Sequence, residues 1–216
     1  MNSNDDITVY YFQGNMRAFP IRCMLDCTKV KYTNKALSFE EWGKLEKPAS
    51  TFEYGAMPVV VINGKAYSQS IAIYNYLGKR LGYMGSNIEE EYEIMNIMAS
   101  WEDIMPKIGL PFFLTDEEAK KKALKELTEE YLPWILPVYE RKFTTKTGKY
   151  MVGDKVSLAD MFVAFLVSLL KNPMRKEITW APLEKYAPKL TLWAEGLLQN
   201  EFKDHYNGSF FKESPL

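Results

Sequence analysis

The stretch that decides the fold is residues 57–70, which read MPVVVINGKAYSQS. The β-branched run after Pro58 predicts a short buried strand, and proline, which has no backbone donor, is typical of strand starts and edges. Asn63-Gly64 is a strong signal for a two-residue type I′ turn, so residues 65–67 are expected to return antiparallel. From Ser70 onward the apolar residues take helical spacing. The stretch therefore predicts a β-hairpin that leads into a helix.

The residues before this stretch add a strand, a helix and a second strand. Residues 7–12, ITVYYF, are β-branched and aromatic, which is typical of a strand, and Gln13-Gly14-Asn15 follows with turn chemistry. Helical spacing then begins, with Pro20 tolerable because it falls in the first turn. Residues 32–37 predict the second strand. The order is βαβ followed by ββα, and we expect residues 1–83 to form one α/β domain.

Strand signals end at Gly82, which fits a helix C-cap and opens a short glycine-containing linker. Pro133 and Pro137 are expected to kink or divide the middle of the region that follows. Ser157 and Asp160 predict a capping box at a helix start, with Asp in place of Glu. Helical periodicity occurs over residues 89–105, 116–132, 157–170 and 188–198. We therefore expect residues 88–216 to form an all-α domain that follows the α/β domain along the chain.

Composition excludes several classes of function. The 216 residues include 27 Lys plus Arg and 28 Asp plus Glu, a formal net charge of −1 that gives no reason to expect a nucleic-acid partner. The single histidine, His205, excludes metal sites built on two or three histidines, and we expect no metal. The longest apolar stretch, residues 161–170, is too short for a membrane span.

The two cysteines, Cys23 and Cys27, do not form a secreted disulfide framework. Their spacing also misses the redox C-x-x-C pattern and places them as small apolar residues on one face of a helix. The polar, acidic residues 1–6 do not begin a secretory signal. Together these features predict the reducing cytosol as the compartment.

Two features in the α/β region suit a small peptide ligand. Pro58 either simply marks the start of a strand or follows a cis peptide bond that presents the Met57 backbone to an extended peptide. Gln69-Ser70 opens the next helix, where free N–H groups and the dipole favour a carboxylate, although Ser70 could equally be an N-cap. Combined, they favour a peptide that carries an α-carboxylate.

With these motifs, the sequence resembles the cytosolic glutathione transferases, and among them the tyrosine classes, with sigma and mu the nearest. The resemblance runs from near the N-terminus to about Leu198, in the order Tyr11-Phe12, Arg17, Trp42, Met57-Pro58, Gln69-Ser70, Glu102-Asp103 and Ser157-Leu158-Ala159-Asp160. It implies a thioredoxin-like domain that binds glutathione and a helical domain that supplies much of the second-substrate pocket. It also implies a homodimer and glutathione as the co-substrate.

The resemblance makes Tyr11 the candidate catalytic residue, because a tyrosine at the end of the first strand donates a hydrogen bond to the glutathione sulfur in this family. A free thiol has a pKa of about 8.5, and a hydrogen bond to the anion lowers that pKa. The thiolate is the nucleophile. Tyr10 is the rival, since adjacent strand residues point to opposite faces. The Tyr-Phe pair followed by Arg17 favours Tyr11.

Further glutathione contacts are implied by position. Arg17 resembles an arginine of the first helix near the active site, and Trp42 a tryptophan whose indole contacts the glycyl end. Glu46 stands where a lysine is expected, so Lys47 is the candidate partner of the glycyl carboxylate through a shift of one residue. Asp103 resembles an acidic residue that reaches the γ-glutamyl ammonium across a dimer interface.

The resemblance also places Tyr54 as an aromatic key that inserts into a partner subunit, with a loop aromatic packed locally as the alternative. Phe12, Met105 and Leu110 are candidate walls of the electrophile pocket, although Met105 could equally be helix core. Asp160 is assigned to folding.

The resulting hypothesis is conjugation of glutathione to hydrophobic electrophiles, which forms a thioether and detoxifies the electrophile. One alternative is a glutathione-dependent isomerase of the prostaglandin type, and another is a non-enzymatic glutathione-binding or ligand-carrying protein. A disulfide reductase is disfavoured because no cysteine pair stands at the strand–helix junction. Residues 202–216 either cover the pocket or simply end the chain.

Overall fold

The computed structural model describes residues 5–172 and 181–208. The chain divides into two compact units, Met1–Met84 with Glu201–Leu216, and Gly85–Asn200. Within the described ranges, no helix combines the length and the apolar character needed to cross a bilayer.

The first unit is built on a four-stranded mixed sheet. Its strands are β1 (Ile7–Phe12), β2 (Thr33–Leu37), β3 (Val59–Ile62) and β4 (Lys65–Ser68), in the spatial order β2-β1-β3-β4. β1 and β2 are parallel, whereas β3 is antiparallel to both of its neighbours. The three predicted strands and the returning strand are therefore confirmed.

The turn between β3 and β4 has two residues. Ile62 pairs with Lys65, and Asn63 and Gly64 have φ angles of 50° and 81°. A type I′ turn requires positive φ at both central residues, and Asn-Gly is the pair that tolerates this best. The turn predicted from Asn63-Gly64 is confirmed.

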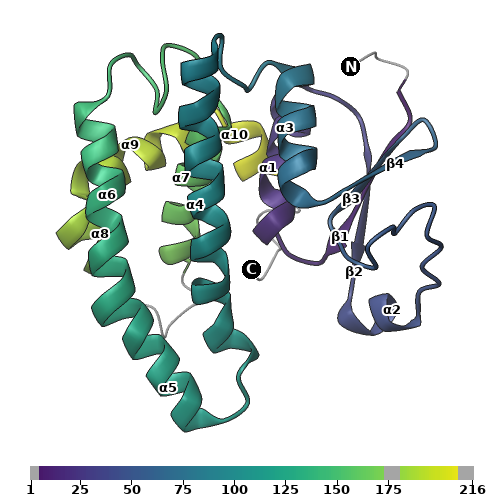
Figure 1. Cartoon of the computed structure of the whole chain (residues 1–216), viewed down its shortest axis with the longest axis horizontal. Coiled ribbons are helices and arrows are strands. Elements are labelled where there is room, and N and C mark those ends of the chain that lie inside the picture. Colours follow the sequence, from purple (N-terminus) through teal and green to yellow (C-terminus); the bar gives the residue numbers. More distant parts are fainter. Residues whose placement is uncertain (1–4, 173–180, 209–216) are drawn as a thin grey trace. The chain divides into compact units, whose positions relative to one another are not determined.

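Four helices and one 3₁₀ turn complete the described part of the first unit. They are α1 (Phe19–Cys27), α2 (Phe39–Lys44), α3 (Ser70–Leu81) and α10 (Lys203–Tyr206), with a 3₁₀ turn η1 at Met16–Ala18. Figure 1 shows α1 and α3 side by side, and α2 apart from them next to β2. Pro20 lies in the first turn of α1, and Gly82 ends α3 with a φ of 82°, both as predicted. The sequence did not predict α2, whose start is fixed by a capping box between Ser38 and Glu41.

The second unit is helical in its described part. Its elements are α4 (Ile88–Phe113), α5 (Glu117–Lys125), the π-helix η2 (Glu126–Tyr131), α6 (Leu132–Thr145), α7 (Leu158–Leu170), α8 (Ala181–Tyr186) and α9 (Pro188–Gln199). α7 is almost entirely buried, and it packs against α4 and α9. The Trp101 ring centroid lies 5.5 Å from that of Phe162 and 5.3 Å from that of Phe165. These rings form the centre of the unit's core.

The start of α7 confirms the predicted capping box. The Asp160 carboxylate accepts hydrogen bonds from the Ser157 backbone N–H at 2.7 Å, the Ser157 hydroxyl at 2.9 Å and the Met151 N–H at 2.8 Å. Asp160 is fully buried, and burial raises its pKa from 3.8 to about 6. Asp160 therefore joins the loop before α7 to the first turn of the helix.

Two helices differ from their sequence-based bounds. The helix expected to end at residue 105 continues to Phe113 through Pro106 and Pro111, and the buried Ile108 extends its apolar stripe past Pro106. The segment expected over residues 116–132 is divided into α5 and η2. Pro133 is the second residue of α6, which continues directly from η2.

The domain boundary at the C-terminal side also needs correction. The described residues from Glu201 to Gly208 belong to the first unit, whereas the sequence assigned residues 88–216 to the helical domain. Phe202 is buried, and His205 Nδ1 lies 2.6 Å from the Asp26 carboxylate of α1. Residues 202–208 therefore pack on α1, and residues 209–216 lie outside the described part.

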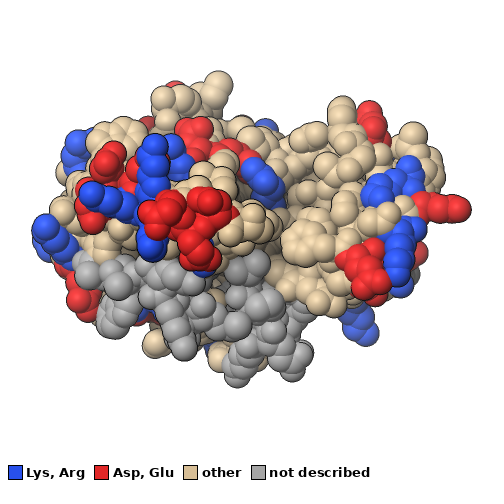
Figure 2. All heavy atoms as spheres, turned by 90° about the horizontal axis from the view of Figure 1, so that it is seen from below, with Lys and Arg blue, Asp and Glu red and all other residues tan. Residues whose placement is uncertain are grey.

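Charged side chains of both signs are interspersed on the face shown in Figure 2. This agrees with the net charge of −1 and with the ion pairs between neighbouring side chains, such as Lys121 with Glu118 at 2.8 Å.

Candidate functional site

Three segments of the first unit meet at one end of its sheet. β1 ends with Tyr11-Phe12, and Tyr10 pairs with Val59 at the start of β3. Val59 in turn pairs with Ser68 at the end of β4. The sheet register therefore places the residues before Val59 next to the end of β1, and those after Ser68 at the same end of the sheet, one strand further on. These are Met57-Pro58 and Gln69-Ser70, as the peptide-site hypothesis requires.

Tyr11 and Tyr10 lie on opposite faces of β1. Tyr11 is buried, and its hydroxyl accepts a hydrogen bond from the Arg17 backbone N–H at 3.3 Å. Tyr10 is half-buried and packs edge-on against Phe52, with 5.4 Å between ring centroids. Because strand side chains alternate between faces, only Tyr11 has its hydroxyl beside the loop that leads into α1.

Arg22 is the residue of this region that sequence reasoning did not place in the site. Its guanidinium is fully buried, it donates to the carbonyl oxygens of Gly14 and Phe12, and its Nε donates to Asn34 Oδ1 at 3.1 Å. The guanidinium carbon lies 5.8 Å from the Tyr11 ring centroid. Burial lowers the Arg22 pKa to about 10, so the side chain remains a cation at neutral pH. The sequence did hold one signal for its burial, because Arg22 is a charged residue within the otherwise apolar start of α1.

Arg17 meets the site through its backbone. It lies in η1, where its N–H donates to Tyr11 and its carbonyl accepts from the Tyr74 hydroxyl at 2.6 Å. Tyr74 belongs to α3, so the loop after β1 is attached to two helices, by Arg22 from α1 and by Tyr74 from α3. The role expected for the Arg17 side chain stays a prediction.

Trp42 and Lys47 lie together. Lys47 Nζ is 4.5 Å from the Trp42 ring centroid and donates to the Leu45 carbonyl at 3.1 Å. Trp42 also packs edge-on against Phe52 at 5.4 Å, while Glu46 is exposed. The geometry thus places a lysine beside the tryptophan despite the shift of one residue.

The backbone at the other two segments is specific. The Met57-Pro58 bond is cis, as one of the two sequence interpretations predicted. Gln69 has a φ of 68° and occupies the N-cap of α3, and Ser70 is the first helical residue. The alternative that Ser70 is the N-cap is therefore wrong. The first N–H groups of a helix lie roughly along its axis and point out of the N-terminal end, toward any ligand there.

The remaining candidates are divided between the two units. Phe12 packs on Phe39 with 4.6 Å between ring centroids, and Tyr54 is 59% exposed; both lie in the first unit. Asp103, Met105 and Leu110 lie on α4 in the second unit. Met105 is buried, as the helix-core alternative predicts, whereas Asp103 and Leu110 are exposed.

Comparison with known proteins agrees with this arrangement. Residues 5–79 match the family described as "Glutathione S-transferase, N-terminal domain", and residues 102–201 match "Glutathione S-transferase, C-terminal domain". The "Glutathione S-transferase class-mu 28 kDa isozyme" of Schistosoma haematobium is 33% identical over 170 residues, which are 76% of this chain and 79% of that protein. The chain therefore belongs to the glutathione S-transferase family.

Solved structures show the same fold. A Nu-class GST from Haemonchus contortus aligns with a TM-score of 0.77 and 25% identity over 98% of each chain. The structure of prostaglandin synthase D of Nilaparvata lugens aligns with a TM-score of 0.75 and 24% identity, covering 94% of this chain and 98% of that one. The fold class is thus a thioredoxin-like α/β domain with an all-α domain, as predicted.

Proposed function

We propose that this protein is a glutathione transferase in which Tyr11 stabilises the glutathione thiolate for attack on a hydrophobic electrophile. The observation that carries the proposal is the position of the Tyr11 hydroxyl, which accepts a hydrogen bond from the Arg17 N–H. Met57-Pro58 and Gln69-Ser70 lie at the same end of the sheet. The product is a thioether, and the electrophile is thereby detoxified.

The chemistry follows from the donor capacity of a phenol. The Tyr11 oxygen accepts from the Arg17 N–H, so its own proton is directed to another acceptor, and accepting one hydrogen bond strengthens the donation of the next. A sulfur anion at that place is stabilised relative to the thiol. Lowering the thiol pKa by two units corresponds to roughly 2.7 kcal/mol. The buried Arg22 cation, 5.8 Å from the centre of the Tyr11 ring, also favours a negative charge close to Tyr11.

Glutathione binding is assigned to three groups of residues around Tyr11. The Met57 backbone holds the extended peptide, the α3 start at Gln69-Ser70 receives the γ-glutamyl α-carboxylate, and Trp42 with Lys47 receives the glycyl end. The last assignment is supported by the 4.5 Å contact of the Lys47 ammonium with the Trp42 ring.

The finer parts of the proposal concern assembly and the second substrate. We propose a homodimer in which Tyr54 is the key residue and Asp103 reaches the glutathione of the partner subunit; the exposure of both side chains supports this. Arg17, Phe12 and Leu110 are assigned to the space around the sulfur and the electrophile, whereas the buried Met105 fits helix core. The unbridged thiols of Cys23 and Cys27 support a cytoplasmic location.

The test is a panel of electrophiles assayed with the wild type, Tyr11→Phe and Tyr10→Phe. We expect Tyr11→Phe to lose thioether formation on the order of tenfold or more while glutathione still binds, because the thiolate fraction falls with the lost hydrogen bond. Tyr10→Phe is the matched control and should retain activity. Endoperoxide isomerisation, measured on the same samples, tests the isomerase alternative. Glutathione binding without turnover in the wild type would instead identify a carrier.

A further inference from the structure

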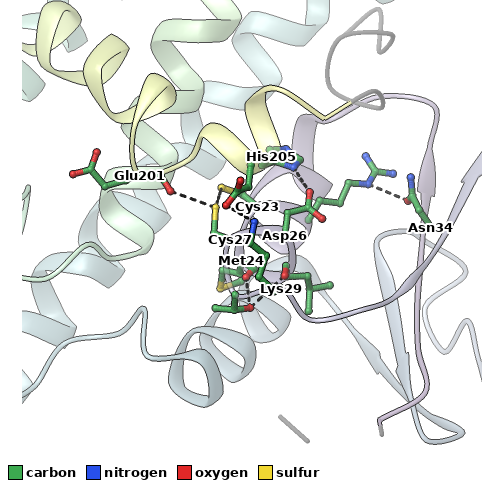
Figure 3. Close-up of polar contacts among 12 residues, drawn as sticks. Cys23, Met24, Asp26, Cys27, Lys29, Asn34, Glu201 and His205 are labelled. Carbon is green, nitrogen blue, oxygen red and sulfur yellow. Dashed lines mark hydrogen bonds and ion pairs between the residues drawn. The ribbon is translucent and has the colours of Figure 1, made fainter. Parts of the chain in front are cut away.

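A pair of thiols lies outside the proposed catalytic site, on α1. Cys23 and Cys27 are both unbridged, and their Sγ atoms are 3.9 Å apart (Figure 3). Cys23 is fully buried, whereas Cys27 is half-buried. A thiol–thiol contact at this distance lets the buried cysteine donate its S–H to the sulfur of the more accessible one.

The electrostatics of the pair are unequal. The hydrogen bond from Cys23 lowers the pKa of Cys27, while burial raises the pKa of Cys23 well above its ordinary value. Cys27 is therefore the thiol that ionises first, and the thiolate is the form that attacks disulfides.

Helix geometry disfavours a bond between the two cysteines. Side chains four residues apart on a helix have Cβ atoms about 5–6 Å apart, whereas a disulfide needs about 3.5–4.5 Å. An oxidised Cys27 must therefore take its second sulfur from another molecule while α1 stays intact.

The C-terminal segment Glu201–Asn207 covers this thiol. The Cys27 S–H donates to the Glu201 carbonyl at 3.6 Å, and Figure 3 shows Glu201 and His205 approaching α1 from the same segment. His205 Nδ1 lies 2.6 Å from Asp26 Oδ2, and the His205 ring packs edge-on against Phe19. An ion pair of 2.5 Å between Lys29 and Asp204 adds a peripheral contact.

From this arrangement we infer that Cys27 is a site of thiol–disulfide exchange with low-molecular-weight disulfides, and that the segment Glu201–Asn207 controls access to it. The Cys27 thiolate attacks one sulfur of the disulfide RSSR; a new bond forms between Cys27 Sγ and that sulfur, the S–S bond of RSSR breaks, and RS⁻ leaves. The Cys27 sulfur is oxidised, the leaving sulfur is reduced, and the proton of the Cys27 thiol goes to solvent.

Modification and docking exclude one another. The RS group added to Cys27 competes for the space around Sγ, where the Glu201 carbonyl lies at 3.6 Å. By linkage, whatever loosens the segment must favour the modified protein at equilibrium, and the modified protein must hold the segment less tightly. Because the segment also covers the Cys27 thiol, loosening it should speed the exchange.

The experiment treats the full chain with 2-hydroxyethyl disulfide and follows the mixed disulfide by mass spectrometry of peptides. Because this probe carries no glutathione, the result is independent of glutathione binding. Cys27→Ser should abolish the adduct. Cys23→Ala removes the hydrogen bond that lowers the pKa of Cys27, so the thiolate fraction of Cys27 falls in this variant. Its adduct should form about threefold more slowly, because the higher nucleophilicity of a more basic thiolate offsets only part of that loss. His205→Ala should accelerate it, while Lys203→Ala, an exposed change on the same short helix, should not.

Hydrogen exchange of the modified wild type provides a second measurement. The amides of Tyr206 and Asn207, which donate to Phe202 and Lys203 carbonyls in the docked segment, should exchange faster after thiolation. An adduct on Cys23 instead of Cys27, a rate in His205→Ala equal to that in Lys203→Ala, or unchanged amide exchange after full modification would each overturn the inference.

Discussion

The guanidinium of Arg22 lies 5.8 Å from the centre of the Tyr11 ring and also holds the carbonyls of the loop that follows Tyr11. One buried cation thus supports both the proposed catalytic phenol and the backbone that positions Arg17. Few other side chains could replace it, because the contact needs several donors fixed in a plane.

Arg22→Lys tests this role while the positive charge is kept. A lysine cannot satisfy Gly14, Phe12 and Asn34 together, so we expect the free energy of unfolding to fall by about 2–4 kcal/mol. Conjugation should fall as well, because the loop loses its anchor. Denaturant unfolding measures the first effect, and Arg141→Lys, the same change at an exposed position, is the control. Equal stability of the two variants would show that the buried contacts matter little.

Lys47→Ala tests the assignment of the glycyl carboxylate. We expect the KM for glutathione to rise about tenfold, since a hydrogen bond to a charged group contributes about 1.5–3 kcal/mol and this site is partly exposed. Steady-state kinetics at varied glutathione provide the measurement. Glu46→Ala changes the neighbouring exposed residue and should leave KM unaltered. If Glu46→Ala has the larger effect, the shift of one residue is wrong.

Asp160→Asn tests the buried capping box through the pH dependence of stability. The folded-state pKa is about 6 against 3.8 for the ordinary group, so the native state binds the proton more tightly than the unfolded state. This contribution to stability is complete below pH 3.8 and is lost as pH rises through about 6. The stability of the wild type minus that of Asp160→Asn should therefore fall by up to about 3 kcal/mol between pH 4 and 7. A difference that grows with pH would mean that the three donors outweigh burial.

Local signals predicted most of the first unit. The Asn63-Gly64 turn and the strand of residues 7–12 were predictable because each depends on backbone preferences of adjacent residues, whereas Met57-Pro58 was left between two interpretations. Part of the candidate site was predictable for the same reason, because its residues lie at the ends of predicted strands, and those ends lie at one end of the sheet.

Contacts between distant residues were not predictable in the same way. The contact of His205 with Asp26 joins positions 179 residues apart, and nothing in either neighbourhood indicates the other. The continuation of α4 past Pro106 depends on tertiary burial that outweighs the lost backbone bonds. The place of Arg22 likewise became evident only with the loop carbonyls around it.

The most direct test of the central claim is the pKa of the thiol of bound glutathione, obtained from thiolate absorbance as a function of pH. In the wild type we expect a value about two units below the free-thiol value of about 8.5, and in Tyr11→Phe a return close to that value. The same pKa in both proteins, with glutathione bound to each, would contradict the role of Tyr11.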